Sequence, residues 1–169
     1  MGEEIEMDTQ EKDSKHREGK YLTFALAGEE YGLPILMIKE IIGLMPITSI
    51  PETPQFVKGV INLRGKVIPV MDLRLKFGLN AKEYTERTCI IVVDIHSDRN
   101  KILMGIVVDS VSEVLSIKAA DIEDTPTFGT NLETAYILGM AKVENRVKIL
   151  LDINRVLTVH DFSFISEAA

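Results

Sequence analysis

The chain alternates between short apolar runs and breaks that contain glycine, proline or asparagine. The runs are rich in valine and isoleucine, as in VIPVM at residues 67–71 and CIIVV at residues 89–93. Such runs, bounded by turn-forming residues, are typical of the short strands that close a sandwich or barrel. With 46% apolar residues among 169, the chain can bury one or two small cores. The pattern therefore predicts an all-β fold.

The segment GVINLRGKV at residues 59–67 resembles a phosphate-binding loop, because two glycines and a lysine lie close together. A P-loop needs four residues between its glycines and a serine or threonine after the lysine. Here five residues separate Gly59 from Gly65, and Val67 follows the lysine. The segment after it is β-branched and contains Pro69, so no helix is expected there. We therefore reject the nucleotide interpretation.

The same segment recurs later in the chain, and the recurrence predicts a β-hairpin. GVINLRGKVIPVMDLRLKF at residues 59–77 aligns with GMAKVENRVKILLDINRVL at residues 139–157, which places Gly65 on Asn145. These two residue types best tolerate the positive φ of a tight hairpin turn. Both segments are therefore expected to be hairpins with their tips at these positions.

Three further segments recur in the same order, which extends the repeat to the whole apolar part of the chain. They are YGLPILMIKEII (31–42) over MGIVVDSVSEVL (104–115), TPQF (53–56) over TPTF (125–128) and, more loosely, YLTFAL (21–26) over CIIVVD (89–94). The chain is therefore interpreted as two copies of one all-β unit.

Asp72 and Asp152 occupy equivalent positions in the two copies. A repeated pair of carboxylates can indicate acid–base catalysis. Each aspartate, however, ends a predicted strand and precedes LRLKF or INRVL, which is the position of a helix N-cap. We expect short helices after both aspartates and a capping role for each.

Charge and composition narrow the classes of function. The net charge is −7 with acids and bases interspersed, which disfavours nucleic acid and anionic membrane surfaces as partners. Residues 1–19 are mostly charged or polar, so we expect a disordered acidic arm. No apolar run reaches the length of a membrane span, and the lone Cys89 cannot form an intrachain disulfide. These features favour a cytoplasmic protein.

The sequence contains no recognisable set of catalytic residues. His16, His96 and His160 lie far apart, and no HExxH, CxxC or GxSxG motif occurs. We therefore expect no enzyme activity, no metal and no cofactor. Binding remains, and the repeat offers an internal comparison, because Arg64 at the first hairpin tip aligns with Glu144 at the second. That charge reversal makes Arg64 a candidate binding residue.

EYGLPILMIKEI, TPQFVKGVINLRGKVIPVMDLRLKFG and GIVVDSVSEVLSI together resemble the CheW family of bacterial chemotaxis coupling proteins, over about residues 20–160. The resemblance implies two packed SH3-like five-stranded β-barrels and no enzyme activity. It also implies two partners, the regulatory domain of the histidine kinase CheA and the cytoplasmic tips of methyl-accepting chemotaxis receptors. An SH3-like peptide-binding or scaffold module of another signalling pathway is the alternative.

The resemblance also assigns site residues. Glu40 and Arg64 match a surface acid–arginine pair beside the receptor-binding groove, and Val111 and Val114 match positions lining it. Ile35 and Ile38, with Leu22, match the apolar patch that meets the kinase. The expected division of the chain is an arm at 1–19, a first barrel at 20–84, a second barrel at 85–160 and a tail at 161–169.

Overall fold

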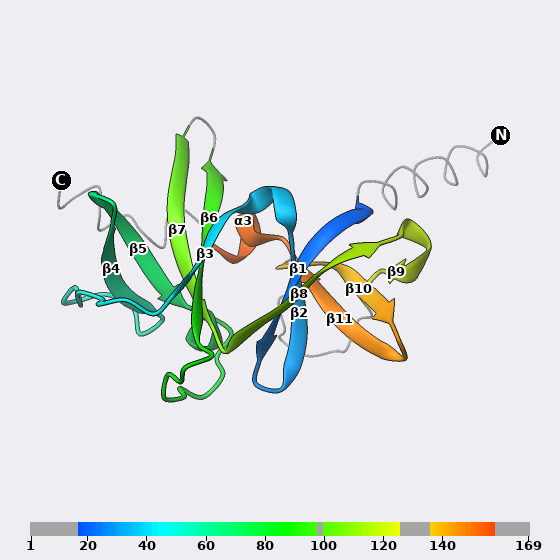
Figure 1. Ribbon diagram of the computed structural model, residues 1–169, viewed down its shortest axis with the longest axis horizontal. Helices are drawn as coiled ribbons and strands as arrows, with labels where there is room; N and C mark the ends of the chain where they lie inside the picture. The colour runs from blue at the N-terminus through cyan, green and yellow to red at the C-terminus, as the bar shows by residue number, and fades with distance from the viewer. Residues whose placement is uncertain (1–16, 98–99, 126–135, 158–169) are drawn as a thin grey trace.

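The protein consists of two curved β-sheets that lie side by side (Figure 1). The computed structural model describes residues 17–97, 100–125 and 136–157. We call the six-stranded sheet barrel I and the five-stranded sheet barrel II. In order across barrel I the strands are β8 (Ser110–Ile117), β1 (Gly19–Leu26), β2 (Glu29–Pro34), β11 (Arg146–Leu151), β10 (Ile137–Val143) and β9 (Ile122–Glu123). In order across barrel II they are β3 (Ile38–Gly43), β6 (Cys89–Ser97), β7 (Asn100–Val108), β5 (Lys66–Asp72) and β4 (Val57–Leu63).

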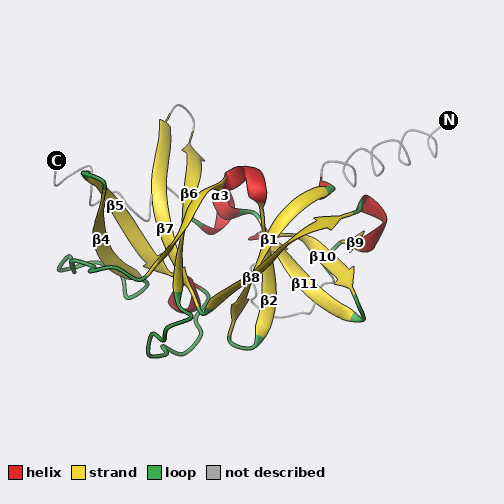
Figure 2. Ribbon diagram, in the orientation of Figure 1, coloured by secondary structure: helices red, strands yellow, loops and turns green. Residues whose placement is uncertain are grey.

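Short helices complete the structure (Figure 2). They are α2 (Leu73–Lys76) and α3 (Ile153–Val156), with the 3-10 turns η1 (Ile35–Met37) and η2 (Ala119–Asp121). The predicted all-β class with two packed sheets is confirmed. In the described part of the chain, barrel I has six strands rather than five, because the two-residue strand β9 adds to β10. Among the described residues, no helix is long and apolar enough to cross a membrane.

The predicted hairpins are present and match each other residue for residue. Gly59 pairs with Val70 in the first, and Gly139 pairs with Leu150 in the second. The first tip is formed by Arg64 and Gly65, and the second by Glu144 and Asn145, with positive φ at all four residues. Positive φ at both central residues matches the right-handed twist of the flanking strands. The equivalence of Gly65 with Asn145 is therefore confirmed.

The two aspartates cap the helices, as predicted. The Asp72 carboxylate accepts a hydrogen bond from the backbone N–H of Arg74 at 2.9 Å, and Asp152 accepts one from Asn154 at 3.1 Å. Their own backbone N–H groups donate to the carbonyls of Phe56 and Tyr136. Tyr136 therefore takes the place of Phe56, whereas most of the aligned TPTF segment lies outside the described residues.

The expected division into consecutive barrels at residues 84 and 85 is corrected by the sheet order. Barrel I combines the first two strands of the first copy with the last four of the second, and barrel II combines the last three of the first copy with the first two of the second. The strands of both barrels therefore come from both sides of that boundary. The reason is local. A single residue, Asp109, separates β7 from β8, whereas a hairpin needs about two loop residues. The chain therefore continues into the other barrel. Residues 1–16 of the expected arm (1–19) and the whole tail (161–169) lie outside the described residues, and Gly19 already begins β1.

The alignment of the first strands shifts by one position. Leu22 pairs with Leu33 across β1 and β2, and Ile91 pairs with Ile106 across β6 and β7. Leu22 therefore takes the place of Ile91, whereas the sequence alignment placed it on Ile90. A one-residue shift moves every side chain to the opposite face of a strand, so the pairing, rather than sequence similarity, fixes this equivalence.

The two barrels share one hydrophobic core. Its buried side chains come from both sheets, including Phe24 and Leu33 of barrel I and Ile91 and Met104 of barrel II. Each barrel also has a smaller outer cluster of its own, one around Val70 and one around Leu150. Because the largest core lies between the sheets, the barrels hold each other in place.

Two glycines allow the parallel strand contacts within the barrels. Gly32 lies beside Leu150 where β2 meets β11, and Gly105 lies beside Val70 where β7 meets β5. A Cβ at Gly32 would lie 2.9 Å from the Leu150 side chain, and one at Gly105 would lie 2.8 Å from the Ile90 side chain. The repeat paired these glycines, and close packing is the physical reason that both copies have one.

Candidate protein-binding surfaces

Glu40 and Arg64, which the family resemblance assigned as a pair, contact each other in barrel II. Both nitrogens at the end of the Arg64 guanidinium donate to the Glu40 carboxylate, at 2.6 and 2.7 Å. The Arg64 side chain is 72% exposed, and that of Glu40 is 28% exposed. The hydrogen bond from Arg64 lowers the pKa of Glu40, and the same contact raises the pKa of Arg64.

The local structure explains why this pair is presented at the surface. Glu40 lies on β3, an edge strand whose side chains alternate between half-buried and exposed. Arg64 occupies the tip of the hairpin between β4 and β5. The side chain of Asn62 accepts a hydrogen bond from the Gly65 backbone at 2.9 Å, which fixes the tip. A rigid turn therefore holds a planar guanidinium with fixed donor geometry.

The sister hairpin of barrel I has a different charge arrangement. Glu144 occupies the tip position of Arg64, and both have positive φ. Lys142, at the position of Asn62, contacts Glu123 of β9 at 2.7 Å, and this contact raises the pKa of Lys142. The charge reversal inferred from the repeat is therefore presented by the same backbone geometry in both barrels.

Val111 and Val114 lie on β8, an edge strand of barrel I, whereas Glu40 and Arg64 belong to barrel II. Val114 is 50% exposed, whereas Val111 is half-buried and packs against the shared core. Ile41 on β3 is 42% exposed. It aligns with Val114 in the repeat, so the sequence contained a signal for Ile41 that the site prediction did not use.

The second predicted surface lies around η1. Ile35 and Ile38 are half-buried and pack against the shared core. Leu22 is 2% exposed and belongs to that core, so the prediction that it joins a binding surface is corrected. Leu36, between the two isoleucines, is 93% exposed. Sequence reasoning missed Leu36 because the run GLPILMI is apolar throughout and contains no periodicity that would separate its faces.

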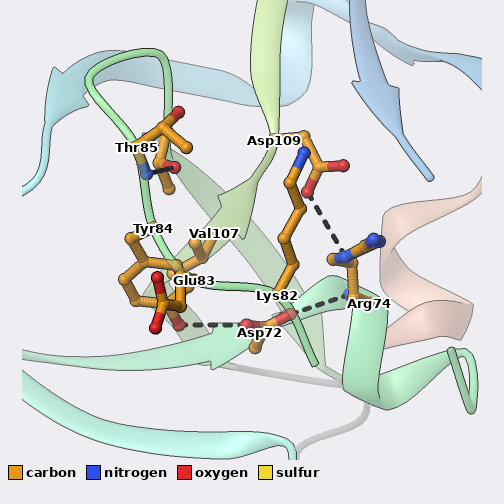
Figure 3. Close-up of a pocket in the computed structure, with 9 residues that line it drawn as sticks. Asp72, Arg74, Lys82, Glu83, Tyr84, Thr85, Val107 and Asp109 are labelled. Atoms are coloured by element: carbon orange, nitrogen blue, oxygen red, sulfur yellow. Dashed lines mark hydrogen bonds and ion pairs between the residues drawn. The ribbon is translucent and has the colours of Figure 1, made fainter. Parts of the chain in front are cut away.

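A polar pocket lies at the end of β5, beside α2 (Figure 3). The Tyr84 hydroxyl donates to the Asp72 carboxylate at 2.9 Å, and burial together with this carboxylate raises the pKa of Tyr84. Asp72 is 2% exposed, and its oxygens accept from the α2 backbone and from Tyr84. These contacts account for Asp72 as a structural residue. Within the described ranges, no group of histidine, cysteine, aspartate and glutamate side chains could hold a metal ion.

Comparison with known proteins agrees with this architecture. Residues 20–160 match the family model for the CheW-like domain. The chain is 40% identical over 150 residues to the chemotaxis protein CheW of Klebsiella aerogenes, covering 89% of this chain and 88% of that protein. It is 38% identical over 139 residues to the chemotaxis protein CheW of Helicobacter pylori, covering 82% and 81%.

A solved structure shows the same fold. The crystal structure of the scaffolding protein TtCheW from Thermoanaerobacter tengcongensis matches with a TM-score of 0.74 and 38% identity. The match covers 85% of this chain and 95% of that one. From the interleaved barrels, the family match across nearly all of the described residues and the shared fold, we conclude that the chain belongs to the CheW family.

Proposed function

We propose that this chain is a non-enzymatic adaptor that couples methyl-accepting chemotaxis receptors to the histidine kinase CheA. The observation that carries the proposal is the Glu40–Arg64 pair, held at the tip of a rigid hairpin in a chain of the CheW family. The sister hairpin, with the same backbone, presents Glu144 instead. A difference between two copies of one scaffold indicates a role in binding rather than in folding.

The proposed receptor surface consists of Glu40 and Arg64 on barrel II and Val111 and Val114 on β8 of barrel I. Ile41 joins it on the grounds of its exposure beside Glu40 on β3. Exposed aliphatic side chains next to an oriented arginine suit an amphipathic helix, since apolar anchors supply affinity and a polar rim supplies specificity. We therefore propose that the receptor tip presents such a helix to this surface.

The proposed kinase surface is centred on η1 and consists of Ile35 and Ile38 with Leu36 between them. Leu36 is exposed while its neighbours pack against the shared core, so the turn presents one apolar side chain on a rigid base. An apolar side chain with this exposure favours a protein partner that covers it. The CheW-like regulatory domain of the kinase is the proposed partner.

The adaptor is proposed to be cytoplasmic and to reach the membrane through the receptors it binds, without inserting into the bilayer and without binding nucleic acid. It is proposed to need no cofactor or metal ion. It would bind two protein partners at the same time, one on each proposed surface.

Reconstitution of three components tests the proposal. Receptor cytoplasmic fragments assembled on vesicles, full-length kinase and this chain are mixed and sedimented. The kinase should sediment with the receptor fragments when this chain is present and stay in the supernatant when it is omitted. With the Arg64→Ala variant, less kinase should sediment than with the unmodified chain. Equal kinase recovery with and without the chain would refute the adaptor function.

A further inference from the structure

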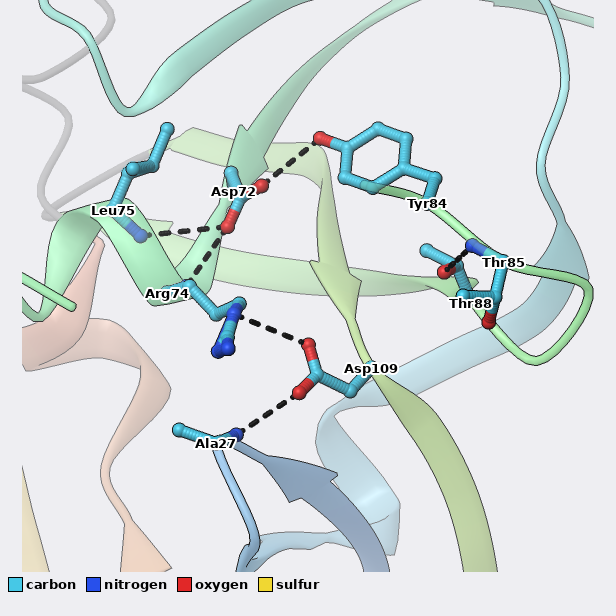
Figure 4. A network of polar contacts seen from close by, with 8 residues as sticks. All are labelled: Ala27, Asp72, Arg74, Leu75, Tyr84, Thr85, Thr88 and Asp109. Carbon is cyan, nitrogen blue, oxygen red and sulfur yellow. Dashed lines mark hydrogen bonds and ion pairs between the residues drawn. The ribbon is translucent and has the colours of Figure 1, made fainter. Parts of the chain in front are cut away.

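Asp109 connects the two barrels at the point where the chain crosses from β7 to β8 (Figure 4). Its backbone N–H donates to the carbonyl of Ala25 at 3.1 Å, and its carboxylate accepts from the backbone N–H of Ala27 at 2.9 Å. Both partners belong to the end of β1 and the turn after it, in barrel I. Two hydrogen bonds therefore attach Asp109 to the end of β1 and the turn that follows it.

The other carboxylate oxygen of Asp109 faces barrel II. It lies 3.5 Å from Nε of Arg74, a residue of α2 whose backbone N–H is held by the Asp72 cap. The two side chains are 14% and 19% exposed. Within the described residues, Nε and Nη1 of Arg74 are buried and find no hydrogen-bond acceptor. Because a guanidinium stays charged, the Asp109 carboxylate is its nearby counter-charge.

The sister junction makes the same kind of connection without a bridging residue. Asn154 has the position in α3 that Arg74 has in α2, and its side-chain oxygen accepts directly from the backbone N–H of His96 at 2.9 Å. In the repeat, Asp109 aligns with Leu36. Each short helix is therefore connected to the first strand of one copy in the other barrel, α3 to β6 directly and α2 to β1 through the Asp109 carboxylate.

The strand that starts after Asp109 is held mainly by its pairing with β1. Among the described strands, β8 pairs with β1 alone, and the pairing is irregular between Leu22 and Phe24, opposite Val114 and Val111. Ser110 and Val111 pair with Ala25 and Phe24 of β1. The next side-chain hydrogen bonds are at Glu113, whose backbone carbonyl and N–H both bond to the Thr23 hydroxyl at 2.9 and 3.1 Å. The stretch from Ser110 to Ser112 therefore lies between two anchors.

We propose that Asp109 is a positioning residue that pins the start of β8 to both barrels and so sets Val111 and Val114 in place relative to Glu40 and Arg64. The strand-anchoring part depends on contacts within the chain. The consequence for receptor binding rests on the proposed function.

Amide hydrogen exchange on the full chain tests the anchoring. In Asp109→Ala, exchange at Ser110–Ser112 should be about tenfold faster, because a charge-assisted anchor is lost. The β4–β5 hairpin should keep its protection. The matched control is Asn154→Ala, which should speed exchange at His96 and leave the start of β8 unchanged. Unchanged exchange at Ser110–Ser112 in Asp109→Ala, or an equal rise throughout the chain, would overturn the proposal.

Two milder variants keep the test decisive if the alanine variant is poorly folded. Asp109→Asn keeps an oxygen for Ala27 but removes the charge that faces Arg74, so a smaller rise in exchange at the same residues is expected. Arg74→Gln should reproduce that rise, and the double variant should exceed neither single variant by much. Fully additive effects would show that Asp109 and Arg74 act independently, which would overturn the two-barrel anchor.

Receptor binding is measured separately on the same variants. Asp109→Ala should bind receptor fragments about fivefold to tenfold more weakly, with kinase binding unchanged. If the unmodified chain fails to bind receptor fragments, the proposed function fails while the exchange result still decides the anchoring. If exchange rises locally and receptor binding is unaffected, Asp109 anchors β8 without positioning the receptor surface, and the positioning role is overturned.

Discussion

The Arg64 guanidinium donates two hydrogen bonds to the Glu40 carboxylate, and it does so across the outside of barrel II, where both side chains remain accessible. Exposed ion pairs contribute little to folding. The geometry is therefore more informative about binding, because a guanidinium oriented in this way can exchange one acceptor for another without moving its backbone.

Arg64→Ala should weaken receptor binding about tenfold if the guanidinium makes a hydrogen-bonded contact at the interface. Arg64→Lys should lose part of the affinity, because an ammonium keeps the charge but not the planar pair of donors. Titration of receptor fragments measures both, and kinase binding should be unchanged. Glu144→Ala at the sister tip is the matched control and should be nearly silent. Equal losses for the two alanine variants would mean that the charge reversal has no functional meaning.

The pH dependence of Glu40 tests whether the pair persists in solution. The hydrogen bond from Arg64 lowers the pKa of Glu40 from its ordinary value of 4.5. The stabilisation of the folded state by the pair is therefore fully present above pH 4.5, and it is lost as the pH falls through the folded-state pKa. Carbon-detected NMR of the carboxyl group should show a midpoint below 4.5. In Arg64→Ala the midpoint should return towards the ordinary value. The same midpoint in both proteins would contradict the contact.

Leu36→Asp should weaken binding of the kinase regulatory domain strongly, because burial of a leucine contributes about 1.5–3 kcal/mol. The thermal midpoint should change little, since Leu36 is 93% exposed. Ile38→Asp is a less clean variant, because Ile38 packs against the shared core and its loss should also lower stability. Val67→Asp, at another exposed aliphatic residue, is the control. Similar effects of Leu36→Asp and Val67→Asp on kinase binding would exclude η1 as the contact.

Lys148 of β11 contacts Glu30 of β2, and the equivalent positions in barrel II are the apolar Ile68 and Leu103. Glu30→Leu should cost about 3 kcal/mol in the free energy of unfolding, because it leaves a lysine side chain that is 8% exposed without its counter-charge. Lys148→Ile should cost less, since Glu30 is 31% exposed and can be hydrated.

The double variant, Glu30→Leu with Lys148→Ile, places two apolar side chains at these positions, as in barrel II. Its free energy of unfolding should lie within about 1 kcal/mol of that of the unmodified protein. Urea unfolding measures all three proteins. If the double variant is as unstable as the sum of the two single variants, the apolar pair does not fit barrel I, and the structural equivalence of the two positions would be wrong.

Division of the chain at residue 84 should yield two fragments that do not fold separately. Each fragment contains two strands of one barrel and three or more of the other, so neither can complete a sheet or bury the shared core. Co-expressed fragments 1–84 and 85–169 should associate one to one, as size-exclusion chromatography and circular dichroism would show. A fragment that folds alone as a monomer would contradict the interleaved topology.

The sequence by itself determined the features that depend on local conformation. Gly65 and Asn145 identified both hairpin tips, because few residue types tolerate positive φ. Asp72 and Asp152 identified both helix starts, because a side-chain oxygen at that position satisfies free backbone N–H groups. The repeat of these signals predicted the duplication, and the specific GVINLRGKVIPVMDLR motif indicated the family.

The tertiary structure decided the features that depend on which segments meet. Leu22 and Leu36 are equally apolar, yet one is in the shared core and the other is exposed. The strand order that interleaves the two copies also set the first-strand equivalence of Leu22 with Ile91, since pairing partners far apart in sequence define it. The role of Asp109 arises from contacts with two other segments. Burial and long-range pairing are properties of the assembled core, and a local pattern of residues does not contain them.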